Sequence, residues 1–343
     1  MHYIKTTNFD KFKCIAGDCP QSCCKGWQIV IDDEALLKYS KTEDGFTERL
    51  VNSIDWEEGL FLQCDGSCAM LNSDGLCDLY IARGEEALCE TCDKYPRHTE
   101  EYEGIRELSL SLSCPEAARM ILENKDRLEF TEWDDEEEDD FDDFDYLLYT
   151  KLEDVRNNVI FPIIQDRSIT FEFKCGILTN LGKRLQAFVD EDELYEMDDF
   201  IWKLADEIKD KNYNGLSVDI SWKNKELFSK LDRLEVLSPD WPETVKNTKE
   251  HWTDDIMLTK DEEVQAEQLL MFFFYVYFDG AVYDDWIYSK VMMSLLSVYW
   301  IFEIDRAKPV SELVRSAYLY AREVEHSDFN LEELETALNE ELD

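Results

Sequence analysis

Cysteine is distributed very unevenly along this chain of 343 residues, and no other feature constrains the fold as strongly. Ten of the eleven cysteines lie between Cys14 and Cys114, and only Cys175 falls outside that segment. Free cysteines pack one at a time as small hydrophobic side chains, which does not explain so dense a set. Metal ligation does explain it, because a soft metal or an iron–sulfur cluster needs several sulfurs brought together by short loops. We therefore expect a metal-binding module in the N-terminal third.

The spacing of the cysteines favours thiolate ligands over disulfide bonds. The pattern reads C-x4-C-x3-C-C, then C-x3-C, a single cysteine, C-x2-C and a last single cysteine. Disulfide frameworks are typical of secreted chains, whereas the first ten residues lack the apolar segment of a secretion signal and the number of cysteines is odd. Histidine is scarce, with four residues in the chain, which favours all-sulfur ligation. Structural zinc and a [4Fe–4S] cluster both use four thiolates, so the identity of the metal stays open between them.

The charge balance excludes some classes of partner. Lys and Arg number 35 against 79 Asp and Glu, which gives a formal net charge of −44. A nucleic-acid-binding protein needs the opposite balance, and an anionic membrane surface would repel this chain as well. Leu269–Phe278 and Val291–Phe302 are shorter than the roughly 20 apolar residues that span a bilayer, so we interpret them as buried helices. We expect a cytoplasmic protein without nucleic-acid or membrane partners. Its acidic surface would attract lysine side chains, although solubility alone also explains such a charge.

The rest of the sequence predicts a mainly α-helical fold with a small α+β, cysteine-rich, metal-binding N-terminal module. We place this module at residues 1–130, an acidic linker or loop at 131–146 and a helical domain at 147–343. The linker contains Glu132–Asp145, a block of eleven carboxylates without a basic residue, which repels itself and favours solvation.

Local patterns predict individual elements within these regions. Short apolar or alternating runs favour strands, and apolar residues that recur every three or four positions favour helices. Asn330 and Glu333 resemble a capping box that opens a last helix. The expected strands are Trp27–Ile31 and Leu108–Ser113, and the expected helices include Asp33–Tyr39, Pro115–Leu122 and Val310–Val324.

Four segments carry a resemblance to a known family: FKCIAGDCPQSCCKGWQIVID, CAMLNSDGLCDLY, LCETCDKYPR and LSLSCPEAAR. Together they resemble the flagellin lysine N-methylase family, and the first three are also similar to a broader cysteine domain that chelates zinc or iron. The resemblance leaves Cys64 and the acidic block unmatched. It implies methyl transfer from S-adenosylmethionine to lysine side chains of flagellin, with a [4Fe–4S] cluster. The cysteines at the family's positions are the expected metal ligands: Cys14, Cys19, Cys23, Cys24, Cys68, Cys77, Cys89, Cys92 and Cys114.

Methyl transfer to lysine needs a neutral amine, and the pKa of free lysine is about 10.4. Tyr95 and Arg97 follow Cys92 closely, so Tyr95 could orient or deprotonate an amine and Arg97 could clamp a carboxylate. A turn stiffened by Pro96 is the structural alternative for both residues. No glycine-rich nucleotide-binding loop occurs, so the cofactor-binding residues stay unknown. The C-x3-C-x2-C spacing of radical enzymes is also missing, so we infer a cluster site and make no claim of radical chemistry.

Other residues near the cysteines have simpler expected roles. We expect turn or cap positions for the acids and a core position for the tryptophan, that is, for Asp18, Asp32, Asp33 and Trp27. A different class of function also fits the sequence. In that alternative the protein is a non-enzymatic interaction module, in which structural zinc holds the N-terminal module together and the acidic surface binds a basic protein.

Overall fold

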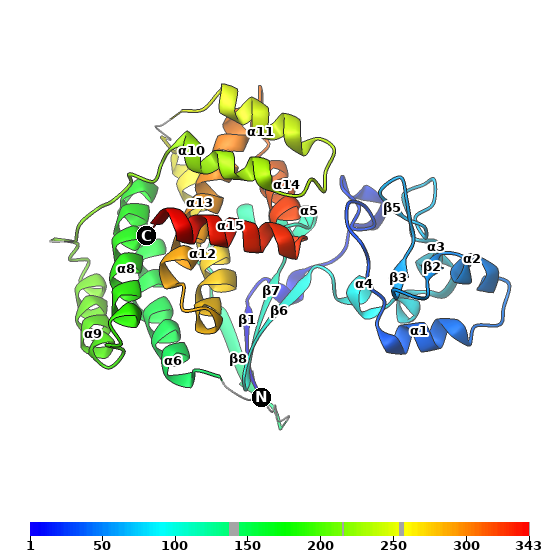
Figure 1. The fold of residues 1–343 in the computed structure, drawn as a ribbon, viewed down its shortest axis with the longest axis horizontal. Coiled ribbons are helices and arrows are strands. Elements are labelled where there is room, and N and C mark those ends of the chain that lie inside the picture. The colour runs from blue at the N-terminus through cyan, green and yellow to red at the C-terminus, as the bar shows by residue number, and fades with distance from the viewer. Residues whose placement is uncertain (137–143, 215, 254–256, 343) are drawn as a thin grey trace.

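The computed structural model describes residues 1–136, 144–214, 216–253 and 257–342. The fold is mainly helical with a small sheet, as predicted (Figure 1). The helices are α1 (Asp33–Ser40), α2 (Thr47–Val51), α3 (Asp78–Arg83), α4 (Glu90–Lys94), α5 (Pro115–Leu122), α6 (Tyr146–Val155), α7 (Phe161–Ile164), α8 (Phe171–Asp190), α9 (Glu196–Lys209), α10 (Lys225–Phe228), α11 (Trp241–Glu250), α12 (Lys260–Tyr277), α13 (Ile287–Arg306), α14 (Leu313–Glu325) and α15 (Asp328–Leu342). The strands are β1 (His2–Thr6), β2 (Ile54–Asp55), β3 (Leu60–Phe61), β4 (Gln63–Cys64), β5 (Ser67–Cys68), β6 (Arg97–Tyr102), β7 (Ile105–Leu110) and β8 (Phe130–Asp134).

The main sheet has four strands in the order β6-β7-β1-β8. Strand β1 lies between two partners, parallel to β7 with His2 opposite Ile105, and antiparallel to β8 with His2 opposite Asp134. Ile4 of β1 is buried, and its carbonyl oxygen accepts a hydrogen bond from the Tyr275 hydroxyl of α12 at 3.0 Å. The sheet is therefore joined to the helical body through its first strand.

Of the three apolar cores in the described residues, a small one and a large one divide the molecule differently from the predicted boundary at residue 130. The third, a minor core, consists of Phe12, Leu110, Cys114 and Ala117. The small core spans Ile29–Cys89 and lies in the lobe that carries α1 to α4, at the right of Figure 1. The large core combines the helices after residue 146 with Ile4, Tyr102 and Leu112 from the main sheet and its connections. The segments around β1 and β6 to β8 thus belong to the helical body, because their apolar side chains are buried against it.

The aromatic-rich helices lie at the centre of the large core, which confirms their interpretation as buried helices. Every residue from Ile287 to Asp305 of α13 is buried. This helix is long and apolar enough to cross a membrane by length and composition, yet the protein surrounds it on all sides. Thr259 starts α12 with a capping box, in which its hydroxyl and the Glu262 side chain each bind the other's backbone N–H.

Several predicted helices have the expected ends because their caps are encoded locally. Helix α1 begins after Asp32, whose Oδ1 accepts a hydrogen bond from the Ala35 N–H at 2.8 Å, so the predicted cap role is confirmed. Helix α5 spans the predicted Pro115–Leu122, and its proline occupies the first position, where no N–H is required. Helix α14 starts at Leu313 rather than Val310.

Three expectations about local structure are wrong. Residues 27–31 form no strand, and only Val30 makes an isolated bridge, to Leu60. The strand predicted at Leu108–Ser113 is β7, which starts earlier and ends at Leu110 because the chain must turn before α5. The last helix begins at Asp328, and the Ser327 hydroxyl, rather than Asn330, accepts a hydrogen bond from its first turn.

The acidic block is structured at both of its ends. Residues up to Asp134 belong to β8, which pairs with β1, and the Asp145 side chain accepts a hydrogen bond from the Leu148 N–H at the start of α6. Residues 137–143 lie outside the described residues. The loop prediction is therefore wrong at residues 131–134, which pair as part of β8, and at residues 145 and 146, which cap and begin α6.

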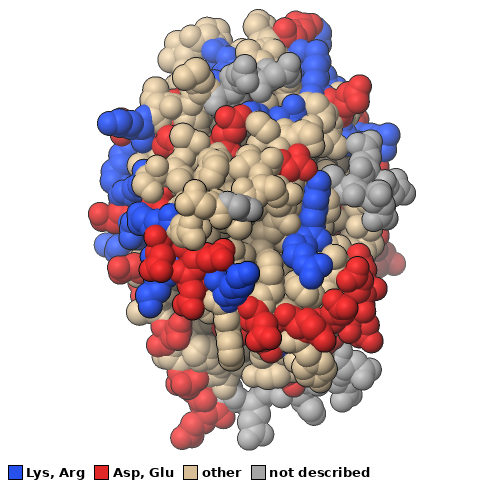
Figure 2. All heavy atoms as spheres, turned by 90° about the vertical axis from the view of Figure 1, so that its left-hand side faces the viewer, with Lys and Arg blue, Asp and Glu red and all other residues tan. Residues whose placement is uncertain are grey.

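The strong negative charge does not form a uniform coat. On the side of the molecule that carries the helical body, acidic side chains gather over the lower half (Figure 2). Lys and Arg side chains lie scattered among uncharged ones over the rest of that face (Figure 2). Attraction of a cationic partner would therefore depend on which part of the surface it approaches.

Candidate functional site

The predicted cysteine ligands fall into two neighbouring groups. Within each group the thiols lie close enough to interact electrostatically, and burial together with these neighbours raises the pKa of Cys19, Cys68, Cys77 and Cys114. We call the set that faces the helical body the first thiol group, and its members are Cys14, Cys19, Cys23 and Cys114. The set that lies in or against the small core is the second thiol group, and its members are Cys24, Cys68, Cys77, Cys89 and Cys92.

The adjacent residues Cys23 and Cys24 connect the two groups. A hydrogen bond from Cys23 lowers the pKa of Cys24 to about 7 and raises the pKa of Cys23 itself. The Cys24 carbonyl also accepts a hydrogen bond from the Cys68 N–H at 2.8 Å. In the second group, a hydrogen bond from Cys92 lowers the pKa of Cys89 in the same way. One thiol of each hydrogen-bonded pair is thus predisposed to lose its proton, which is the state that binds metals.

Thiols are ligands of the kind that soft metals prefer, but their positions here do not form a complete ligand shell. Among the residues that the structure describes, no three Cys, His, Asp or Glu side chains are placed to hold one ion together. Cys64 is exposed, and Cys175 is buried in the core of the helical body, far in sequence from both groups. The donor set therefore fits a thiolate-bound zinc or iron–sulfur group by residue type and grouping, and ligation would require short movements of the cysteine loops.

The first thiol group meets the helical body at a cluster of stacked rings. The rings of Trp27 and His326 are stacked, with centroids 4.0 Å apart and planes 18° apart. The guanidinium carbon of Arg322 lies 4.1 Å from the centroid of the Trp27 ring. The Tyr95 ring lies 5.7 Å from Trp27 and 6.1 Å from His326, measured between centroids. Trp27 is half-buried at this junction, and residues from α14 and the following turn cover it.

Ser113 links the polar atoms of this junction. Its Oγ lies 2.7 Å from Nε2 of His326, 3.0 Å from the Tyr95 hydroxyl and 2.7 Å from Oγ of Ser111. Burial lowers the pKa of His326 to about 4, so its imidazole is neutral at physiological pH. Burial raises the pKa of Tyr95, so its phenol keeps its proton. In this state Tyr95 and His326 are uncharged hydrogen-bond partners of Ser113.

Glu325, the last residue of α14 and the neighbour of His326 in the chain, has a carboxyl that is better suited to accept a proton. Burial raises the pKa of Glu325 to about 7, and its Oε1 accepts a hydrogen bond from the Tyr277 hydroxyl at 3.1 Å. His98, whose Nε2 lies 2.6 Å from Oε1 of Glu100, is near enough to interact electrostatically with Glu325. A general base works best when its pKa is close to the working pH, which Glu325 satisfies.

Arg97 is not part of the junction. It starts β6, is exposed, and its guanidinium carbon lies 5.9 and 5.6 Å from the ring centroids of Phe9 and Phe12. Both rings pack in the same minor core as Cys114 and Tyr95, and the role of carboxylate clamp stays a prediction for Arg97. Arg322 and His326 were missed by the sequence analysis, because nothing local connects them with cysteines about 300 positions earlier. The scarcity of histidine is the one signal that could have singled out His326.

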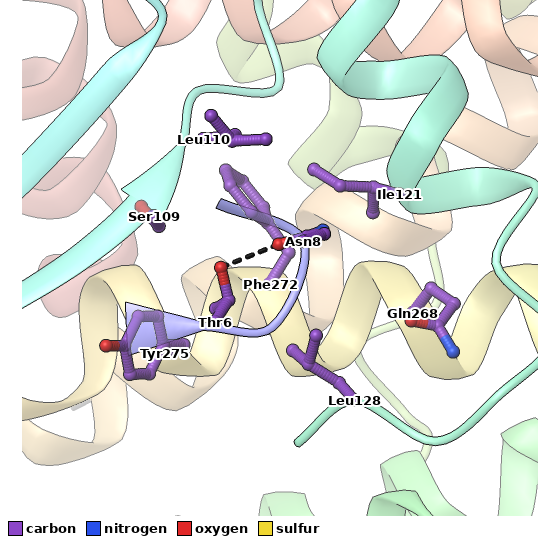
Figure 3. Close-up of a pocket in the computed structure, with 9 residues that line it drawn as sticks. All are labelled: Thr6, Asn8, Ser109, Leu110, Ile121, Leu128, Gln268, Phe272 and Tyr275. Carbon is purple, nitrogen blue, oxygen red and sulfur yellow. Dashed lines mark hydrogen bonds between the residues drawn. The ribbon is translucent and has the colours of Figure 1, made fainter. Parts of the chain in front are cut away.

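Two hollows lie in the helical body, away from the thiol groups. The one drawn in Figure 3 has a volume of about 10 Å³, and the Thr6 hydroxyl donates a hydrogen bond to Oδ1 of Asn8 at 2.6 Å on its wall. That volume holds about one water molecule and is too small for a substrate. The second, of about 320 Å³, is lined by Phe130, Phe161 and Tyr275 and by the buried Arg156. Neither hollow receives a predicted site residue.

Comparison with known proteins adds evidence from the C-terminal part of the chain. Residues 157–343 match the family model described as the FliB lysine N-methylase C-terminal domain. The chain is 31% identical over 131 residues to a lysine-N-methylase of Salmonella typhimurium strain LT2, which covers 36% of this chain and 33% of that protein. It is 32% identical over 126 residues to the flagellar biosynthetic protein FliU of Salmonella muenchen, which covers 34% of this chain and 75% of that protein.

A lysine-N-methylase of Salmonella choleraesuis strain SC-B67 is 32% identical over 130 residues, and 32% of that protein is covered. The chain thus spans about a third of the length of both lysine-N-methylases. No solved structure matches the chain. Because the matched residues 157–343 are more than half of the chain, it belongs to the family of the FliB lysine N-methylase C-terminal domain.

Proposed function

We propose that this protein transfers methyl groups from S-adenosylmethionine to lysine side chains of flagellin. The observation that carries the proposal is the family match over residues 157–343, whose helix α14 contacts the loop that carries Cys23 and Cys24 through Arg322. The FliU relative is named as a flagellar biosynthetic protein, and two other relatives are named lysine-N-methylases, which supports flagellin as the lysine-bearing substrate.

The proposed cofactor of the thiol groups is a [4Fe–4S] cluster, with zinc as the alternative. Nine cysteines supply the thiolates, divided between the first and second thiol groups. A buried donor without a hydrogen-bond partner, Nη1 of Arg322, interacts with Cys19 and Cys23 and fits an anionic metal–thiolate group. When bound, a cluster with an open iron would supply a coordination position for the amino and carboxyl groups of S-adenosylmethionine.

The residues of the junction would prepare the lysine for methyl transfer. The ammonium must lose a proton, and we assign its removal to Glu325, which directly precedes His326 in the chain and has a pKa of about 7. Tyr95 and Ser113 would hold the neutral amine by hydrogen bonds, and the stacked rings of Trp27 and His326 would exclude water.

Coexpression with the flagellin of the host organism tests this activity. Lysine-containing flagellin peptides should gain mass in steps of one methylene unit when the protein is present. The modification should disappear in Cys23→Ser and Cys92→Ser and persist in Cys175→Ala, because Cys175 lies outside both thiol groups. Metal-loaded protein that leaves flagellin unmodified would contradict the proposed substrate. Colourless, zinc-loaded protein that binds flagellin without modifying it would instead support the non-enzymatic alternative.

A further inference from the structure

Arg322 holds the loop that carries Cys23 and Cys24 against the helical body. Its side chain projects from α14, is 5% exposed and stacks on Trp27. Nη2 donates hydrogen bonds to the carbonyl oxygens of Ser22 at 3.1 Å and Lys25 at 2.6 Å, on either side of the two cysteines. The backbone of the loop is shaped for this contact, since the next residue, Gly26, has a φ of +94° and leaves room for the guanidinium.

The second terminal nitrogen of Arg322 lacks a partner. Nη1 is buried and makes no hydrogen bond in the part of the chain that the structure describes. No ion pair joins Arg322 to a carboxylate in that part either, although a buried guanidinium is costly without a counter-charge. The groups that interact with it most strongly are Tyr95, Cys23, Cys19 and Tyr318. The Glu323 carboxyl also interacts with it electrostatically, but both of its oxygens accept hydrogen bonds from the backbone N–H groups of Leu237 and Ser238. Among these, only the thiols lose their protons when they bind a metal.

We propose that Arg322 is the counter-charge of the first thiol group, and that it couples metal binding there to the docking of the cysteine loop on the helical body. Each thiol that ligates releases its proton to solvent as a sulfur–metal bond forms, and the resulting metal–thiolate group is anionic for zinc and for a [4Fe–4S] cluster alike. The negative charge of this group then balances the positive charge of the buried guanidinium. This inference rests on the metal site of the proposed function but not on methylation or its substrate. The proposed role concerns the first thiol group alone. Arg322 interacts electrostatically with Cys19 of that group, whereas the second group lies in or against the small core.

Metal affinity in Arg322→Gln tests the proposal. Outer partners of metal ligands typically contribute roughly 10–100-fold to metal affinity, and we expect a loss of that size. Arg322→Lys keeps the charge without the planar double donor and should lose less. Arg315→Gln is the matched control on the same helix, since Arg315 is exposed and pairs with Glu312, and its affinity should equal that of the unmodified protein. Affinity is read by competition with a chelator under anaerobic conditions, with iron or zinc counted per chain.

The effect should be confined to the first thiol group. When Cys68→Ala has weakened the second group, Arg322→Gln should still lower the affinity for the remaining metal. When Cys19→Ala has weakened the first group, Arg322→Gln should no longer change it. An equal loss in both backgrounds would overturn the proposal.

Unfolding separates this role from a purely structural one. Arg322→Gln should lower the free energy of unfolding of the metal-loaded protein by more than that of the chelated protein, because the guanidinium is neutralised only when the metal is bound. Equal losses in the two states would make Arg322 a structural residue and overturn the coupling. Protein that methylates flagellin without bound metal would likewise overturn this inference while the proposed activity stands. Bound metal with the expected Arg322 effect, but without methylation, would leave the inference standing and remove the activity.

Discussion

The buried ion pair between Arg156 and Glu107 gives a quantitative test of how the sheet is joined to the helical body. Glu107 lies in β7, and Arg156 opens a π-helical turn between α6 and α7; both are 1% exposed. Nη1 of Arg156 donates to Oε2 of Glu107 at 2.8 Å, and Nη2 donates to Oε1. The carboxyl of Asp279 lies 2.8 Å from the same Nη1. Burial raises the pKa of Asp279, so this carboxyl keeps its proton more readily than an exposed aspartate. We expect it to ionise and pair with Arg156 when Glu107 is replaced.

The two partners should therefore differ in their cost when replaced. Arg156→Met leaves the Glu107 carboxylate buried without a counter-charge and should lower the free energy of unfolding by about 3–5 kcal/mol. Glu107→Gln should cost only about 1–3 kcal/mol, because Asp279 can ionise beside the guanidinium in its place. Adding Asp279→Asn removes this second carboxyl, and the free energy of unfolding of the double variant should again fall by about 3–5 kcal/mol.

Urea unfolding followed by tryptophan fluorescence measures these differences, with the free energies extrapolated to water. Glu312→Gln is the control, since it breaks the exposed pair with Arg315 and should cost less than about 1 kcal/mol. If Glu107→Gln is as costly as Arg156→Met, Asp279 does not take over the charge and the reasoning is refuted.

Three further predictions concern the cysteine-rich lobe and its junction. Cys23→Ser, Cys24→Ser, Cys89→Ser or Cys92→Ser should lower the metal content per chain, whereas Cys175→Ala should not, and equal content in all five would contradict the grouping. Asp32→Ala should lower the free energy of unfolding by about 1–2 kcal/mol, because Asp32 caps α1 through Ala35 and accepts the Glu90 N–H at 2.8 Å; an unchanged denaturation midpoint would exclude this role. His326 has a pKa of about 4 when folded and 6.5 ordinarily, so the folded state binds fewer protons. Its contribution, up to about 3 kcal/mol, is present above pH 6.5 and lost as the pH falls toward 4. His326→Gln should abolish this part of the pH dependence, and an unchanged profile would show that another group is responsible.

The elements with local signals could be predicted from the sequence. Asp32 and Pro115 mark helix starts through side chains or ring geometry within one turn, so α1 and α5 begin where expected. The apolar runs Leu269–Phe278 and Val291–Phe302 indicated buried helices, because a helix segment that is apolar on all sides is typical of a protein core. The predicted strand at 27–31 failed because a short apolar run needs a partner strand, and the fold gives it only the contact of Val30 with Leu60.

The division between the cores and the residues of the junction depends on contacts between distant parts of the chain. Strand β1 lies between β7 and β8, more than 100 positions away, and this pairing moves the main sheet into the helical body. Trp27 packs against the small core, as expected, but it is only half-buried and also stacks on His326, which lies beyond α14. The cysteine spacing indicated metal ligation but not a division into two groups. Cys114 lies near Cys14 and Cys19 because strands β6 and β7 bring the chain back toward them.

Methylation of flagellin in a purified system tests the central claim most directly. The metal-loaded protein is mixed with host flagellin and S-adenosylmethionine that carries a deuterated methyl group, and lysine peptides are analysed by mass spectrometry. We predict labelled methyl groups on flagellin lysines with the unmodified protein and with Arg315→Gln, and none with Cys23→Ser. The rate should fall as salt is added, because the acidic surface steers the cationic lysines. Flagellin that remains unlabelled in the presence of metal-loaded, folded protein would contradict the claim.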